Sequence, residues 1–206
     1  MIDDSERGLE LDLETHTYTY AGVRVAGVSE VLTGLGIVNP TWFSEFARER
    51  GSAVHSALEY LLTGKLLWDR LDPRIVKYVE AAVRFLDDAK ADREGAWVER
   101  PVYHQVLRYA GTPDLVTTVF GDPCIADWKT GGTGAAGIAT ALYDMAIRDE
   151  RGFERPLRRM AVQLKPDGTY RKTDLKDPND YIDGQSAVRL FNRFHINRKD
   201  KDKTHE

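Results

Sequence analysis

The sequence is poor in the residues on which disulfide-bonded, cluster-binding and membrane proteins depend. Cys124 is the only cysteine among 206 residues, which excludes an internal disulfide, an iron–sulfur cluster and a cysteine-rich zinc site. A lone thiol fits a reducing compartment, so we expect a cytoplasmic protein. No apolar run approaches the roughly 18 residues of a membrane helix, and the acidic, polar N-terminal stretch does not resemble a secretory signal. We therefore expect no membrane association.

Excess positive charge, which many nucleic-acid-binding proteins carry, is also missing, because the net charge is −4. The charges are unevenly distributed along the chain. Residues 1–150 hold 15 Lys+Arg and 24 Asp+Glu, whereas residues 151–206 hold 14 and 9. An acidic part that binds metal, joined to a basic part that meets phosphates, is physically coherent. Ordinary variation of surface charge explains the same numbers.

The spacing of apolar residues predicts one domain of mixed secondary structure. Alternation favours a β-hairpin over residues 9–25, and helical spacing favours helices at 30–35, 41–63, 135–148 and 177–194 and from residue 73 onward. Runs rich in β-branched and aromatic residues predict strands at 96–109, 115–120, 124–128, 157–164 and 170–175. This order fits a single α/β (α+β) domain over residues 1–196. The charged segment 197–206 is expected to be a disordered tail.

Two acidic residues and a lysine stand where two predicted strands meet. Asp114 begins one strand, and Asp127 and Lys129 lie two apart near the end of the next. Side chains two apart share one face of a strand, and the tight turn at 121–123 makes the strands antiparallel neighbours, so the carboxylates converge. Converging carboxylates repel unless a cation neutralises them, and oxygen ligands suit Mg²⁺ or Mn²⁺. With Lys129 to orient water or stabilise phosphate charge, these residues suit phosphodiester hydrolysis.

A D-x-K triplet is a weak indicator by itself, because Asp and Lys at a strand end are usually solvated or paired at the surface. Its context strengthens the prediction: the apolar Ile125-Ala126 precede it, and the loop at 130–132 follows it. Charges at the mouth of a buried strand are costly unless they serve a purpose.

A histidine on the helix predicted at 41–63 is a further candidate ligand. Gly51 and His55 are one helical turn apart on the same face, and Glu59 lies one more turn along it. A neutral imidazole binds Mn²⁺ well, and Gly51 permits close approach of the backbone. The alternative interpretation is that His55 is an ordinary polar residue on the flank of a helix.

These motifs together resemble the PD-(D/E)xK nuclease superfamily, specifically its RecB-type and phage exonuclease branch. The resemblance spans roughly residues 9 to 195 and implies a restriction-endonuclease-like core, in which helices flank a central mixed β-sheet. The motif residues occur in the family's order along the chain. They are Gly51 and His55, Gly111 to Asp114, and Asp127-Trp128-Lys129-Thr130-Gly131.

By this resemblance, Asp114 and Asp127 bind Mg²⁺ or Mn²⁺, with His55 and the backbone carbonyl of Trp128 as further ligands. Lys129 is then the catalytic lysine. The resemblance also implies that these residues form one active site, and that the protein is a metal-dependent phosphodiesterase whose substrate is DNA.

Glu99 resembles the family's first acidic motif, and three roles are open to it: ligand of a second metal, partner of Lys129, or surface carboxylate. Thr130-Gly131 and Tyr143 correspond to positions that contact or orient DNA. The family's Q-x-x-x-Y motif is incomplete, because Ala139 occupies the glutamine position. That departure weakens the inference of DNA positioning.

The resemblance implies a DNA exonuclease of phage recombination or replication type, working in the host cytoplasm if phage-encoded. A single-strand annealing or recombination protein is the expected partner, and homo-oligomers occur among the relatives. The glycine-rich segment 131–134 lacks the P-loop pattern, so no nucleotide cofactor is expected. Two alternatives are a non-catalytic nucleic-acid-binding module with the nuclease fold and an unrelated metal hydrolase. Ala139 and the modest charge favour the former, whereas the intact Asp114, Asp127 and Lys129 argue against it.

Overall fold

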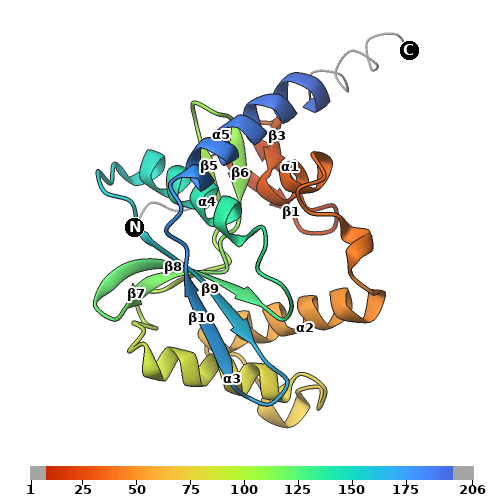
Figure 1. Ribbon diagram of the computed structural model, residues 1–206, viewed down its shortest axis with the longest axis vertical. Coiled ribbons are helices and arrows are strands. Elements are labelled where there is room, and N and C mark those ends of the chain that lie inside the picture. The colour runs from red at the N-terminus through yellow and green to blue at the C-terminus, as the bar shows by residue number, and fades with distance from the viewer. Residues whose placement is uncertain (1–7, 197–206) are drawn as a thin grey trace.

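The chain folds into two five-stranded mixed sheets and five α-helices (Figure 1), as the computed structural model of residues 8–196 shows. The side chains of Trp42 and Ile196 are not described. The expected tail at 197–206 lies outside the described residues. The mixed α/β class predicted from the sequence is confirmed. Among the described helices, none has the length and apolar character needed to cross a bilayer.

The central sheet has the strand order β10-β9-β8-β7-β4. Its middle strands β8 and β9 run parallel, and the other neighbours are antiparallel. Parallel neighbours need a crossover connection, which here is the helix α4 (Ala136–Arg151). The strands are β4 (Trp97–Val98), β7 (Leu115–Val119), β8 (Asp122–Lys129), β9 (Arg158–Leu164) and β10 (Tyr170–Asp174).

Helices cover both faces of the central sheet, and β8 shows which side chains face which layer. Ala126 and Trp128 pack in the core formed with α2 (Glu45–Leu62) and α3 (Val76–Asp88). Ile125 packs in the opposite core with α4. Because side chains alternate along a strand, the odd-numbered Asp127 follows Ile125 onto the α4 face.

The second sheet has the order β1-β2-β3-β6-β5, with β3 and β6 parallel. The predicted hairpin is confirmed between β2 and β3, where Ala21 and Gly22 both have positive φ, as a type I′ turn requires. A further antiparallel strand, β1, precedes it. The strands are β1 (Leu9–Asp12), β2 (Thr17–Tyr20), β3 (Val23–Gly27), β5 (Val102–His104) and β6 (Tyr109–Gly111).

The single strand predicted at 96–109 is wrong, because this segment is divided between the two sheets. β4 joins the central sheet, whereas β5 and β6 join the other. The break falls at Glu99, whose φ is +47°, and at Pro101, which has no N–H to donate to a sheet. Two helix starts also differ from the prediction: α2 begins at Glu45, capped by Ser44, instead of at residue 41, and α1 (Val28–Gly34) begins before the predicted start at residue 30.

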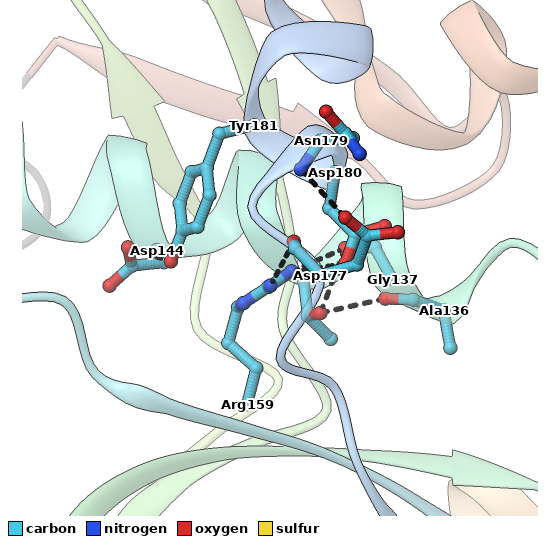
Figure 2. A network of polar contacts seen from close by, with 9 residues as sticks. Ala136, Gly137, Asp144, Arg159, Asp177, Asn179, Asp180 and Tyr181 are labelled. Atoms are coloured by element: carbon cyan, nitrogen blue, oxygen red, sulfur yellow. Dashed lines mark hydrogen bonds and ion pairs between the residues drawn. The ribbon is translucent and has the colours of Figure 1, made fainter.

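The buried guanidinium of Arg159 holds the last helix, α5 (Asn179–Phe191), against α4 (Figure 2). It donates to the Gly137 carbonyl at 2.7 Å, to Asp180 at 3.0 Å and to the Asp177 carbonyl at 3.2 Å. The Tyr181 ring lies 4.6 Å from the guanidinium carbon. These contacts fix the start of α5, and the chain then continues from α5 into a π-helical segment, Asn192–Ile196.

Candidate metal centre

Three acidic residues lie side by side because three neighbouring strands of the central sheet end or begin together. The pairs Val98↔Leu115 and Leu115↔Ala126 place these residues opposite one another across β4, β7 and β8. The residue next in line on each strand is Glu99, Asp114 or Asp127. The Glu99 N–H also donates to the Asp114 carbonyl at 3.2 Å.

His55 reaches this row of carboxylates from α2. Its Nδ1 atom lies 3.2 Å from Asp114 Oδ1 and 4.0 Å from Glu99 Oε1. One ligand atom from each of His55, Glu99 and Asp114 lies within 4.8 Å of the others. The structure therefore brings together one nitrogen and two carboxylate ligands, which is a spacing that suits a metal ion.

Asp127 and Lys129 form a pair beside this cluster. Their side chains share one face of β8, and Lys129 Nζ lies 2.5 Å from Asp127 Oδ2. Asp127 is only 5% exposed, and its Oδ2 atom makes no aligned hydrogen bond with any described residue. The contact is therefore a close ion pair within a largely buried site, where the loss of either partner would leave an uncompensated charge.

Burial and mutual repulsion make the carboxylates reluctant to ionise together. Burial, reinforced by the charge of Asp114, raises the pKa of Glu99 to about 8. Burial also raises the pKa of Asp127 to about 6, despite the opposing charge of Lys129. Such elevated pKa values indicate excess negative charge in a confined space, the condition under which a bound divalent cation is favourable.

The pKa shifts of the other ionisable groups of the site each favour the charged form. Burial alone would raise the pKa of Asp114, but His55, Lys129 and the Trp128 N–H together lower it. Burial opposes protonation of His55, yet the charges of Asp114 and Glu99 raise its pKa. Burial likewise opposes the charge on Lys129, and the neighbouring aspartates raise its pKa. The acidic and basic side chains of the site therefore stabilise one another's charges.

A metal ion fits these residues on three grounds. The ligand atoms of His55, Glu99 and Asp114 are mutually close. Burial and the neighbouring charge of Asp114 raise the pKa of Glu99, so its ionised form lacks compensation. Imidazole nitrogen and carboxylate oxygen are the donors that Mn²⁺ accepts, and the carboxylates alone suit Mg²⁺. Asp127 stands next to this set within the same row of carboxylates.

The cluster opens into a cleft with a volume of about 1140 Å³. The central sheet and α2 supply most of the charged residues of its lining, and the second sheet and α1 add Arg24 and Glu30. Further lining residues come from the β1–β2 region, from α4 and from the end of α5. A pocket for a small ligand usually measures roughly 300–1,000 Å³, so the cleft has room for more than one nucleotide-sized group.

The structure gives the other predicted positions mainly supporting contacts. The Trp128 side chain is buried in the core, and the backbone N–H of Trp128 donates to Asp114 Oδ2 at 2.7 Å. The Thr130 carbonyl accepts from Arg50 at 3.3 Å, and the Gly131 carbonyl accepts from the Gln163 side chain at 2.8 Å. These bonds fix the loop that follows Lys129.

Tyr143 reaches the cleft from α4, and Gly111 makes room for its ring. A Cβ atom on Gly111 would lie 2.6 Å from Tyr143 Cε1 and 2.8 Å from Val28 Cγ2. One on Gly51 would lie 3.6 Å from the nearest atom, Thr130 Oγ1, an ordinary contact distance. Gly51 therefore has space beside it, and among the motif glycines the tightly packed one is Gly111. Ala139 packs in the α4 core and does not line the cleft.

Three residues that line the cleft could not be identified as site residues from the sequence. Tyr18 lines the cleft from β2, and its hydroxyl lies 2.8 Å from Thr112 Oγ1. His16 and His195 line it from the β1–β2 turn and the π-helical segment. Each comes from a segment far from the motifs, so only the folded chain brings it to the site.

Two other residues with reactive side chains lie outside the cleft lining. His104 faces Asp149, with 3.6 Å between Nδ1 and Oδ2. Cys124 is buried in β8, and burial raises the pKa of its thiol to about 12. Neither side chain is placed to take part in chemistry at the candidate metal centre, and a buried thiol with a raised pKa is a poor nucleophile.

Comparison with known proteins leaves the family open. No family model and no curated protein matches the chain. Among solved structures, the chain resembles one from Eubacterium rectale described as a "Putative exonuclease". The two share 11% sequence identity with a TM-score of 0.48, over 84% of this chain and 79% of the other. A likeness this distant says nothing about activity, which must be inferred from the site itself.

Proposed function

We propose that the protein is a metal-dependent nuclease that hydrolyses phosphodiester bonds of DNA. The observation that carries the proposal is the convergence of His55, Glu99 and Asp114 within 4.8 Å of one another, beside the Asp127–Lys129 pair. This arrangement joins residues that can hold a metal to a nearby lysine, and both kinds of group stabilise the charge that develops during phosphodiester hydrolysis.

In this proposal, His55, Glu99 and Asp114 hold Mg²⁺ or Mn²⁺, with Asp127 and the Trp128 carbonyl as additional ligands. When bound, the metal supplies Lewis-acid activation of water and stabilises charge on the phosphate. Asp127 Oδ2 lies 2.5 Å from Lys129 Nζ, and this ion pair keeps the lysine ammonium group at the mouth of the site. From there Lys129 orients the attacking water and stabilises negative charge that develops on the phosphate.

The hydrogen bond from the Trp128 N–H orients one oxygen of Asp114, so that the other faces His55. Preorganised ligands of this kind reduce the rearrangement that metal binding demands. Action at DNA ends, and the association with phage recombination, rest on the sequence resemblance alone. Binding to an annealing protein and self-assembly remain predictions for the same reason.

The test is digestion of linear duplex DNA labelled at the 5′ or the 3′ end, with Mg²⁺, with Mn²⁺ and with a chelator. We expect degradation that needs the metal, and the released label reports polarity and exonuclease character. Lys129→Ala is expected to abolish cleavage, while Lys176→Ala, which changes an exposed lysine outside the cleft, is expected to leave it intact.

Degradation that survives the chelator, or that Lys129→Ala leaves unchanged, would overturn the proposal. Metal-dependent DNA binding without any cleavage would instead identify a non-catalytic module. Cleavage of a small phosphate ester but not of DNA would point to a different class of metal hydrolase. Ala139 gives no structural reason to prefer the inactive module, because it packs in the core.

A further inference from the structure

An aromatic surface lines the same cleft as the metal cluster but is built from other elements. His195, in the π-helical segment after α5, stacks on Phe191, with 4.7 Å between ring centroids and 15° between ring planes. Both rings line the cleft. Phe191 is 4% exposed, whereas His195 is exposed. We call Gly34, Phe191 and His195 the aromatic shelf.

Contacts with α1 and with the β5–β6 connection hold the aromatic shelf in place. Phe191 packs against α1 so closely that a Cβ atom on Gly34 would lie 2.5 Å from Phe191 Cε2. The Asn192 side chain donates to the Leu107 carbonyl at 2.9 Å, which ties the start of the π-helical segment to the β5–β6 connection. π-Helical segments are rare and often occur at functional sites. Here the segment presents a flat, exposed imidazole on a fixed aromatic base.

The cleft offers little spare positive charge for a polyanion. Among the described lining residues, Arg24 is paired with Glu30 at 2.6 Å, and Lys129 is paired with Asp127. Charge attraction to phosphates is therefore weak away from the metal, and other contacts must hold the strand. Stacking of a base on an aromatic side chain is independent of sequence and contributes roughly 1–3 kcal/mol per base.

We propose that the aromatic shelf is a base-stacking subsite, at which a nucleobase of the substrate strand lies on the exposed face of His195. The inference rests on the proposed nuclease function and deepens it, because it assigns the rest of the cleft to the strand beyond the bond being cut. Histidine is among the side chains on which unstacked bases lie in nucleic-acid complexes. The hydroxyl groups of Ser29 and Thr33, which line the same cleft, are neutral donors suited to the sugar and phosphate of that nucleotide.

The experiment compares two substrates under metal: a thymidine nitrophenyl phosphodiester, which carries a single base, and a single-stranded oligonucleotide. His195→Ala is expected to raise the KM for the oligonucleotide relative to that for the small diester by roughly 5-fold to 100-fold. His195→Phe, which keeps a flat ring, is expected to restore most of that ratio. Phe194→Ala removes an adjacent exposed ring that does not line the cleft, and it should leave the ratio unchanged.

A second readout does not depend on cleavage. An oligonucleotide that carries 2-aminopurine and phosphorothioate linkages should lose fluorescence on binding to the wild-type protein and to His195→Phe, because stacking quenches the base. His195→Ala should bind it with less quenching. Gly34→Ala, which pushes against Phe191, should change both readouts in the direction of His195→Ala.

The outcomes separate the two proposals. If the wild-type protein cuts neither substrate with any metal, the nuclease function fails, while the quenching still decides the stacking subsite. If the wild-type protein cuts DNA but His195→Ala matches it in KM ratio and quenching, the subsite alone is rejected. An equal loss on both substrates, together with a lower melting temperature, would show that His195 only stabilises the fold and would also reject the subsite.

Discussion

The carboxylate of Asp114 links the sheet to the candidate metal ligands. One oxygen accepts the Trp128 backbone N–H at 2.7 Å, and the other lies 3.2 Å from His55 Nδ1. The first contact ties the start of β7 to the end of β8, just beyond their last paired residues. Asp114 therefore contributes both to the pairing of the strands and to the chemistry of the site. A substitution that removes its charge but keeps its oxygen acceptor tests the two roles separately.

Asp114→Asn should retain the fold but lose Mn²⁺ binding and metal-dependent cleavage. The asparagine oxygen can still accept the Trp128 N–H, whereas the neutral amide is a poor ligand beside His55. Because residues that only support a metal ligand already affect affinity or activity by roughly 10- to 100-fold, a ligand itself should matter at least as much. Titration calorimetry with Mn²⁺ and the end-label assay measure both effects.

Asp122→Asn is the matched control, because Asp122 begins the neighbouring strand β8 at the opposite end of the β7–β8 pair, and its side chain is 69% exposed. It should bind Mn²⁺ and cut DNA like the wild-type protein. Equal Mn²⁺ affinity in the two variants would remove Asp114 from the ligand set.

Gly111→Ala and Gly51→Ala should have opposite effects on stability. At Gly111 the added methyl would meet Tyr143 and Val28 at less than normal contact distance, and overpacking of this kind costs about 1–3 kcal/mol. At Gly51, within α2, the methyl meets only Thr130 at 3.6 Å, and alanine favours a helix over glycine by about 0.5–1 kcal/mol. Urea unfolding of the two variants gives both values, and a destabilising Gly51→Ala would contradict the assigned packing.

The proximity of Asp114 to Asp127 and Lys129 could be predicted from the sequence, because it depends on features that are close together in the chain. A tight turn joins two consecutive strands, and the period of two along β8 places both side chains of the D-x-K triplet on one face. These relationships span few residues, so the sequence is sufficient to determine them. The convergence of His55 with Asp114 was predicted through the motif order rather than through geometry.

The position of Glu99 could not be derived in the same way. The sequence suggests one strand over 96–109, whereas the left-handed backbone at Glu99 and the missing N–H of Pro101 separate β4 from β5. The two short strands then pair with partners in different sheets, and local propensity does not encode that choice. The aromatic shelf is similar, since Phe191 and Gly34 are far apart in the sequence and meet only through tertiary packing.

In the presence of a chelator, folding stability should fall as the pH rises from about 4.5 to about 8. Over this interval the unfolded chain releases the Glu99 proton at its ordinary pKa of 4.5, while the folded protein retains it because the folded pKa is about 8. Rising pH therefore favours the unfolded state. Glu99→Gln should flatten this dependence, and saturating Mn²⁺ should raise the melting temperature more at pH 8 than at pH 5. A pH-independent difference between wild type and Glu99→Gln would contradict the assigned burial.

Replacing the buried Arg159 by alanine tests whether the contacts that hold α5 contribute to the free energy of unfolding. Arg158→Ala, at the adjacent arginine, is the control. Arg159 is 4% exposed and bonds to Gly137, Asp177 and Asp180 (Figure 2). Its removal leaves Asp180 unpaired beside Gly137 and should cost about 3–5 kcal/mol, as for other broken buried pairs.

Arg158 pairs with Asp174 nearer the surface, with 26% of its side chain exposed, so its removal should cost less than about 1 kcal/mol. Chemical denaturation at neutral pH measures both differences. Because α5 leads directly into the π-helical segment, Arg159→Ala should also weaken the quenching of the 2-aminopurine oligonucleotide, whereas Arg158→Ala should not. Equal losses of stability in the two variants would show that burial of Arg159 does not strengthen its contacts, and would leave another interaction to hold α5 in place.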